Sequence, residues 1–272
     1  MTTAAILLAA GQGTRMRSAL PKTLHPIAGR PMLRHLLAAV EQAFDRAVVV
    51  VGPDMPALEA AAAPHPTVVQ AERLGTGHAA LQAAPLLEGL SGDVAVLYAD
   101  NALIGAGTMR RLLAARRKAG LALLAMRPAD PAKYGRVLTD ESGAVTRIVE
   151  WADASEEMRR VGLCNAGVVC APAADLFRWL REVRNDNRQG EYYLTDIVAI
   201  AAAEGVRVEA VEAPEPELRG INSRAELADA EAEVQRQLRR APPAGGAAPV
   251  QPDSRRLIPP NPPGPGGSQR PQ

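Results

Sequence analysis

The chain has 272 residues, and 47% of them are hydrophobic, so it can bury a large core. Only 3% are aromatic, so that core must be mainly aliphatic, and the 31 basic residues nearly balance the 30 acidic ones. This balance gives no electrostatic case for a nucleic-acid or membrane partner. No apolar run approaches the roughly 20 residues that span a bilayer, and the N-terminus lacks the basic region of a signal peptide. We therefore expect a soluble, cytoplasmic protein.

The first half of the chain alternates between two sequence patterns. Short continuous apolar runs are typical of buried parallel strands, and the segments between them carry apolar residues three and four positions apart, as helices do. This alternation predicts an α/β fold, with a parallel sheet covered by helices on both faces. The expected strands are 4–8, 47–51, 67–70, 93–98 and 121–126, and the expected helices are 32–40, 58–62, 79–87 and 109–119.

After residue 126 the pattern indicates a mixed sheet region. A hairpin is expected from 136–139 and 145–150 around the turn 140–143. Further strands are expected at 165–170 and 207–211, and helices at 176–180, 194–203 and 226–240. We assign residues 1–240 to one domain with a mixed, mostly parallel sheet flanked by helices. Residues 241–272 are rich in Pro and Gly, which predicts a disordered tail.

The spacing of the two cysteines, Cys164 and Cys170, matches neither a metal nor a redox motif. We expect two buried thiols in a reducing compartment.

A Gly-rich loop follows the first predicted strand. Gly11 and Gly13 let the backbone approach a ligand closely and direct N–H groups at anionic oxygens. Arg15 and Lys22 add two cations, a combination that suits a triphosphate. The loop is not a Walker A motif, because Lys22 lacks the preceding glycines, and Met16 stands where a dinucleotide fingerprint has its third Gly. On its own, the loop is equally consistent with a tight turn that carries surface cations.

The spacing of this loop and of several later motifs resembles the sugar nucleotidyltransferase superfamily. Within it, the stretch 70–79, Gln-Ala-Glu-Arg-Leu-Gly-Thr-Gly-His-Ala, is similar to the uracil-binding segment of one branch. That branch is the uridyltransferase domain of the bifunctional N-acetylglucosamine-1-phosphate uridyltransferase/glucosamine-1-phosphate acetyltransferases. The resemblance covers about residues 4–238, and further matching stretches follow in order at 134–136, 148–150, 165–167, 189–196 and 220–224.

The resemblance implies a Rossmann-like fold of the nucleotide-diphospho-sugar transferase type. It also implies an enzyme that uses Mg²⁺ to transfer UMP from UTP to N-acetylglucosamine-1-phosphate, giving pyrophosphate and UDP-N-acetylglucosamine, a cell-wall precursor. It assigns catalytic roles to Arg15, Lys22 and Asp100, and metal binding to Asp100 and Asn222. The substrate-binding residues that it implies are Leu8, Ala10, Gly11, Gly13, Gln70, Gly75, Thr76, Tyr98, Gly135, Glu150, Asn165 and Asn222. No catalytic residue is expected within 189–196.

Four alanines depart from the family pattern. Ala99 and Ala102 flank Asp100 where the family has Gly and Pro, Ala152 replaces a Lys, and Ala166 replaces a Thr near the sugar. These departures keep two alternatives open: a nucleotidyltransferase for another sugar-1-phosphate, and a nucleotide-sugar-binding module with little activity.

The bifunctional enzymes continue into a left-handed β-helix that carries the acetyltransferase and forms trimers. This sequence has no six-residue repeat of the kind that a β-helix needs. We therefore expect neither acetyltransferase activity nor trimerisation through such a domain.

Overall fold

The structure, a computed structural model, describes residues 2–240. Its centre is a mostly parallel sheet in the order β11-β7-β10-β6-β1-β4-β5, with the hairpin β8–β9 attached through β10. Strand β10 runs antiparallel between β6 and β7. The strands are β1 (Thr3–Leu8), β4 (Arg46–Val51), β5 (Thr67–Val69), β6 (Asp93–Tyr98), β7 (Leu121–Met126), β8 (Arg136–Thr139), β9 (Val145–Val149), β10 (Cys164–Pro172) and β11 (Val208–Glu212).

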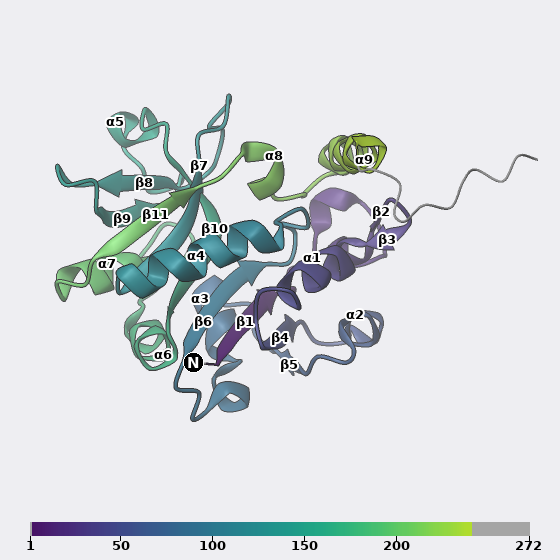
Figure 1. Cartoon of the computed structure of the whole chain (residues 1–272), viewed down its shortest axis with the longest axis horizontal. Coiled ribbons are helices and arrows are strands. Elements are labelled where there is room, and N and C mark those ends of the chain that lie inside the picture. Colours follow the sequence, from purple (N-terminus) through teal and green to yellow (C-terminus); the bar gives the residue numbers. More distant parts are fainter. Residues whose placement is uncertain (1, 241–272) are drawn as a thin grey trace, which may run out of the picture.

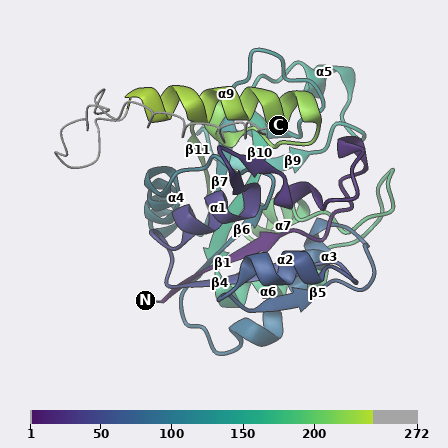
Figure 2. The same ribbon diagram turned by 90° about the vertical axis from the view of Figure 1, so that its right-hand side faces the viewer.

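Helices cover both faces of this sheet (Figures 1 and 2). On one face, α1, α2 and α4 pack onto one aliphatic core, and on the other α3, α6 and α7 pack onto a second. The α/β fold and the mixed, mostly parallel sheet predicted from the sequence are therefore confirmed. The helices are α1 (Met32–Val40), α2 (Pro56–Ala62), α3 (Thr76–Leu81), α4 (Ala106–Lys118), α5 (Glu156–Arg159), α6 (Ala173–Glu182), α7 (Asp196–Ala203), α8 (Glu215–Leu218) and α9 (Arg224–Arg240).

The apolar periodicity explains how these helices pack. In α1 the fully buried side chains are Met32, Leu33, Leu36, Leu37 and Val40, which recur every three or four residues and form one stripe. The strands between the helices are buried on both faces, as expected for continuous apolar runs. Local pattern and tertiary burial therefore agree through the first half of the chain.

The helix predicted over 79–87 is wrong in its extent. Helix α3 ends at Leu81, and a separate 3₁₀ turn covers Ala84–Leu87. Pro85 is the reason, because proline disfavours helical dihedrals in the residue before it and has no N–H to donate. The prediction also missed the short hairpin of β2 (Pro26–Ile27) and β3 (Arg30–Pro31).

Helix α9 lies against the β2–β3 hairpin, far from its own place in the sequence (Figures 1 and 2). A small apolar cluster joins Ala230 of this helix to Ile27 of the hairpin. The last described helix is thereby packed close to the Gly-rich loop near the N-terminus.

Both cysteines are free and buried, as predicted. Among residues 2–240, none of the helices combines the length and apolarity needed to cross a membrane. The predicted tail at 241–272 lies outside the described residues.

The topology brings the predicted site residues to one edge of the sheet. The parallel strands β1 and β6 end there at Leu8 and Tyr98, and the antiparallel β10 begins there, with Asn165 as its second residue. The open end of the β8–β9 hairpin faces the same edge, with Gly135 before one strand and Glu150 after the other. Ligands of open α/β sheets bind at the carboxyl ends of such strands.

Candidate active site

Two cavities lie side by side at this edge, and both are lined by Tyr98 and Asp100. The first, which we call the loop cavity, has a volume of about 330 Å³. The second, the hairpin cavity, has a volume of about 550 Å³. Of the predicted site residues, the loop cavity is also lined by Leu8, Ala10, Gly11, Lys22, Gln70, Gly75 and Thr76. The hairpin cavity is also lined by Arg15, Gly135, Glu150, Asn165 and Asn222. Only Gly13 among them lines neither.

Gly13 instead shapes the Gly-rich loop. Its φ is 62°, in the left-handed region that favours glycine, and a Cβ there would lie 2.6 Å from Cβ of Lys22. The chain then forms the 3₁₀ turn Thr14–Met16, which carries Arg15 and is anchored by the fully buried Met16. The glycine therefore lets the loop fold back against Lys22.

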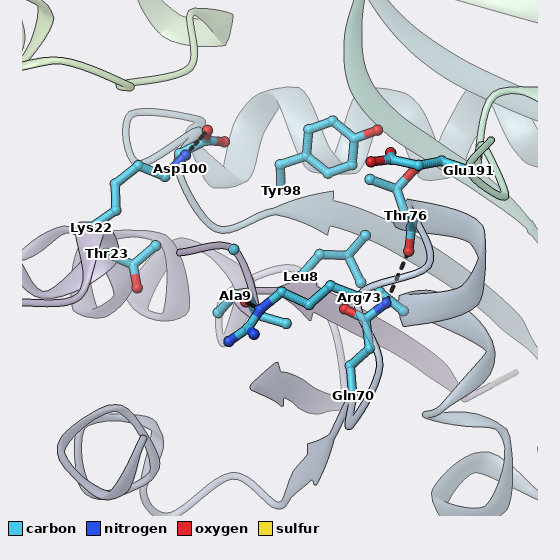
Figure 3. A pocket seen from close by; sticks show the side chains of 14 residues that line it. Leu8, Ala9, Lys22, Thr23, Gln70, Arg73, Thr76, Tyr98, Asp100 and Glu191 are labelled. Atoms are coloured by element: carbon cyan, nitrogen blue, oxygen red, sulfur yellow. Dashed lines mark hydrogen bonds and ion pairs between the residues drawn. The ribbon is translucent and has the colours of Figure 1, made fainter. Parts of the chain in front are cut away.

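A cluster of opposite charges lies where the two cavities meet. The Lys22 ammonium donates to Asp100 Oδ2 at 2.5 Å and to Asn222 Oδ1 at 2.9 Å. Arg15 donates to the same Asn222 oxygen at 2.8 Å. Figure 3 shows the Lys22 side chain extended along the loop cavity with its ammonium on Asp100. Both predicted cations therefore converge on the two predicted metal ligands.

Asn222 lies directly before the residue that caps α9 and does not cap the helix itself. Its backbone N–H donates to Glu226 Oε2 at 2.7 Å, and the cap of α9 is supplied by Ser223, whose hydroxyl accepts from the N–H of Glu226 at 3.3 Å. Arg224 donates from Nε to the carbonyl of Met16 at 3.0 Å. The start of α9 thus fixes both the Asn222 amide and the turn that carries Arg15.

The two oxygen ligands would suit Mg²⁺. The side chain of Asp100 is 13% exposed, and its Oδ1 is a buried oxygen without a hydrogen-bond partner among the described residues. A carboxylate and an amide oxygen are hard ligands of the type that Mg²⁺ prefers. In residues 2–240 no group of three or more His, Cys, Asp and Glu side chains could hold a metal. The protein's share of such a site would therefore be small, as is common for Mg²⁺ bound together with substrate phosphates.

The far end of the loop cavity is built around Gln70. This side chain is 4% exposed, and its amide nitrogen donates to the Gly75 carbonyl at 3.0 Å (Figure 3). Gly75 has φ 115°, and a Cβ there would lie 2.6 Å from the carbonyl oxygen of Tyr192. Only glycine suits that position. The turn therefore presents main-chain groups and one fixed amide to a ligand.

The hairpin cavity is lined by polar side chains from separate strands. Glu150 is partly buried, and burial raises the pKa of its carboxyl group. A Cβ at Gly135 would lie 3.2 Å from Glu150 Oε2, so glycine leaves room beside the carboxylate. Asn165 is 7% exposed and accepts from the Gly167 N–H at 3.0 Å. The arrangement offers fixed hydrogen-bond partners for a polyhydroxylated ligand.

Tyr98 forms part of the wall between the cavities. Desolvation raises the pKa of its phenol, and the negative charge of Glu150 raises it further. The hydroxyl therefore stays protonated at neutral pH and is able to donate as well as accept.

Three of the four alanines that differ from the family pattern line neither cavity. Ala99 is fully buried in the core behind the sheet, so its methyl group does not crowd the ligand path. Ala102 packs in the cluster under α9, and the turn is held by Asn101, which donates to the Leu218 carbonyl at 2.5 Å. Ala152 lines neither cavity, whereas Ala166 lines the hairpin cavity. Of the four departures, only the one at Ala166 changes the wall of a cavity.

Residues 5–194 match the family model of the MobA-like NTP transferase domain. The chain belongs to this family. The resemblance to nucleotidyltransferases predicted from the sequence is thereby confirmed.

Within this family, the chain is similar to curated proteins that share one name. The chain is 63% identical over 256 residues to a protein named bifunctional protein GlmU from Gluconacetobacter diazotrophicus. It is 58% identical over 253 residues to a protein of the same name from Gluconobacter oxydans. These alignments cover 92% and 93% of this chain but only 55% and 56% of the relatives. The chain thus spans about half the length of the curated relatives it matches.

Solved structures support the fold. A UDP-glucose pyrophosphorylase complexed with UDP-glucose superposes with a TM-score of 0.71 at 20% identity, covering 87% of this chain and all of that one. At this identity the likeness concerns the fold alone.

Three residues that were not predicted from the sequence also lie in or next to the two cavities. Arg73 lines the loop cavity and donates from Nε to the Ala10 carbonyl at 2.8 Å. Glu191 lines the same cavity, and Thr195 bonds the Glu150 carboxylate. All three lie in stretches quoted for the resemblance, but nothing in their local spacing indicates that 191–195 folds against 70–76.

Proposed function

We propose that this chain transfers UMP from UTP to N-acetylglucosamine-1-phosphate, giving UDP-N-acetylglucosamine and pyrophosphate. The observation that carries the proposal is the meeting of two cavities at one cluster of Asp100, Lys22 and Asn222. A transfer between two substrates needs both reacting groups at one point, and such a point lies between the cavities.

The loop cavity would hold UTP. The bonds to the amide nitrogen of Gln70 fix its orientation, so its amide oxygen is available to accept from uracil N3–H. Main-chain groups of Gly75 and of the Gly-rich loop would pair with the other edges of the base and with the ribose. The triphosphate would then run towards Arg15 and Lys22, where positive charge lies beside backbone N–H groups.

The hairpin cavity would hold the sugar phosphate. Glu150 and Asn165 would bind hydroxyl and amide groups of the sugar, with Gly135 giving it room beside the carboxylate. The phosphate would point towards Arg15, which lines this cavity and reaches Asn222. Its oxygen would thereby face the α-phosphorus of UTP.

The chemistry requires positioning and charge neutralisation rather than a general base. A phosphate oxygen of the sugar substrate is already anionic when it attacks the α-phosphorus, and pyrophosphate leaves from the opposite side. Arg15 and Lys22 would neutralise charge on the phosphates as it shifts towards the leaving group. Asp100 and Asn222 would hold Mg²⁺, which when bound supplies further charge neutralisation on the phosphates.

The relatives named bifunctional protein GlmU, at 63% and 58% identity, support N-acetylglucosamine-1-phosphate as the acceptor rather than another sugar-1-phosphate. One observation favours a second candidate, a different sugar-1-phosphate as acceptor. Ala166 lines the hairpin cavity where the resembled family has a threonine, so a hydroxyl near the sugar is absent.

Pyrophosphate release across a panel of sugar-1-phosphates, with UTP and Mg²⁺, tests the proposal. We expect release with N-acetylglucosamine-1-phosphate and its loss in an Asp100→Ala variant that still melts cooperatively. Release with another sugar alone would support the second candidate. UTP binding without release for any sugar would contradict both and leave a binding module.

A further inference from the structure

The segment 191–196 connects the two cavities. On the loop-cavity side, the Tyr192 N–H donates to the Leu74 carbonyl at 2.8 Å, and the Tyr192 carbonyl accepts from the Gly77 N–H at 2.8 Å. The Leu194 N–H donates to the Thr76 hydroxyl oxygen at 3.0 Å. These bonds fix the segment to the turn that follows Gln70.

On the hairpin-cavity side, the same segment ends at Thr195, directly before α7. The Thr195 hydroxyl donates to Glu150 Oε1 at 3.1 Å, and the residue is only 2% exposed. Thr195 occupies the N-cap position of α7 but makes no side-chain cap hydrogen bond. Its backbone has helical dihedral angles, φ −64° and ψ −21°, which differ from the extended ones of a capping residue. The hydroxyl is directed to the carboxylate.

The two oxygens of Glu150 therefore have different surroundings. Oε1 is held from behind by Thr195, which lines neither the loop cavity nor the hairpin cavity. Oε2 lies towards Gly135, on the side of the hairpin cavity. The hydrogen bond restricts the rotamers of the Glu150 side chain before a ligand binds. Less conformational entropy is then lost on binding.

We propose that Thr195 is a positioning residue, which aims the Glu150 carboxylate into the hairpin cavity. The inference rests on the proposed function insofar as the ligand of that cavity is a sugar phosphate. Because the same segment holds Thr76 and the Gly75 turn, Thr195 places the sugar-binding carboxylate relative to the nucleotide site.

The charge state of Glu150 follows from the groups around it. Burial is the largest influence and raises its pKa, the Thr195 hydroxyl lowers it, and the negative charges of Asp196 and Asp153 raise it. Burial and Asp153 also raise the pKa of Asp196, to about 6. The other ionisable groups that line the hairpin cavity with Glu150 are Arg15, Tyr98, Asp100, Lys133, Tyr134 and Glu226. Glu150 also lines a third cavity, whose other ionisable groups, apart from Asp153 and Asp196, are Arg147, Arg184, Asp186 and Tyr193.

The direction of the pH effect follows from the hydroxyl bond. A hydrogen bond to the ionised carboxylate stabilises it, so removing the hydroxyl must raise the Glu150 pKa further. If binding needs the ionised form, activity is lost as the pH falls through this pKa. In Thr195→Val the acid limb of the pH profile should therefore move to higher pH.

The decisive comparison is between Thr195→Val, which keeps the shape and removes the hydroxyl, and Thr195→Ser, which keeps the hydroxyl. We expect Thr195→Val to raise KM for the sugar phosphate by about tenfold, since a bond to a charged group is lost. KM for UTP should change little, and Thr195→Ser should restore most of the affinity and the acid limb. If Thr195→Val unfolds, Thr195→Ala is compared with Thr195→Ser in its place.

A carboxyl ¹³C NMR titration of Glu150 separates failure of this inference from failure of the proposed function. It reports the Glu150 pKa without turnover, so it applies even if no sugar phosphate reacts. A higher pKa in Thr195→Val than in wild type and Thr195→Ser supports the inference. An unchanged pKa, or equal effects of the Val and Ser variants on KM and pH profile, would overturn it.

Discussion

The loop cavity and the hairpin cavity are built in different ways, although they meet at Asp100. The loop cavity is formed mainly by two stretches, 8–23 and 70–79, and much of its wall is main chain or small side chain. The hairpin cavity collects side chains from 132–135, 150, 165–167 and 218–226, which come together only in the folded sheet. The loop cavity thus draws most of its lining from two contiguous stretches, whereas the hairpin cavity draws on more separate parts of the chain.

This difference explains where the sequence can vary. Where the main chain contacts a ligand, the side chain can vary as long as the backbone keeps its geometry. Gly13 and Gly75 are positions where that geometry requires glycine. Side-chain contacts constrain residue identity, and the one departure that reaches a cavity, Ala166, lies on the hairpin side. We infer that nucleotide choice is the more fixed property of this fold and sugar choice the more adjustable one.

The largest effect should come from Asp100, a charged residue that lines both cavities. Asp100→Asn removes the charge while keeping the size of the side chain, so we expect turnover to fall by about 10²–10³. UTP affinity measured by calorimetry without metal should change far less, because the loop cavity keeps its other contacts. A loss of turnover below tenfold would show that Asp100 is not the point where the two sites act together.

Lys22→Met should also reduce turnover by about 10²–10³, because one cation near the phosphates is lost. Its second consequence follows from the geometry, since the ammonium bonds Asp100 Oδ2 and Asn222 Oδ1, one oxygen from each residue expected to bind metal. We expect Mn²⁺, used as a probe in electron paramagnetic resonance, to bind more tightly to this variant than to wild type.

The matched control for the metal prediction is Arg73→Met, which removes a cation from the same cavity. Arg73 donates to the Ala10 carbonyl and not to Asp100 or Asn222. Its Mn²⁺ affinity should therefore rise less than that of Lys22→Met. Equal increases would indicate a general electrostatic effect rather than competition for the two oxygens.

Glu150→Gln tests the hairpin side alone. Because the charged group that we propose as a partner of the sugar is lost, we expect KM for the sugar phosphate to rise by about tenfold and KM for UTP to stay within about twofold. The raised pKa of Glu150 also predicts an acid limb above the ordinary carboxyl range in wild type, since sugar affinity is lost as the group is protonated. This limb should be absent from the variant's profile of kcat/KM for the sugar phosphate.

Part of the site could be predicted from the sequence. The Gly-rich loop and Gln70 lie in contiguous stretches whose spacing carries the signal, and the alternation of strands and helices places them at one sheet edge. The pairing of Thr195 with Glu150 could not be found, because 45 residues and an antiparallel strand separate them. The burial of Ala99 was also hidden, since the direction of a side chain after a strand depends on the turn that follows.

The smallest effect is expected from Ala166→Thr, which restores the hydroxyl of the resembled family to the hairpin cavity. We expect the ratio of kcat/KM between N-acetylglucosamine-1-phosphate and glucose-1-phosphate to change by a few fold, since one added hydrogen-bonding group is worth about 1 kcal/mol. KM for UTP serves as the internal control and should not move. A change of UTP affinity as large as that of the sugar would place Ala166 outside the sugar site.

We propose that two separately built cavities bind the two substrates and meet at one charged cluster. Initial-rate kinetics of Gln70→Leu, Glu150→Gln and the double variant test it most directly. We predict that Gln70→Leu raises KM for UTP alone, that Glu150→Gln raises KM for the sugar phosphate alone, and that their effects on kcat/KM multiply, as expected for independent sites. Single variants that each raise both KM values, with effects that fail to multiply, would contradict it.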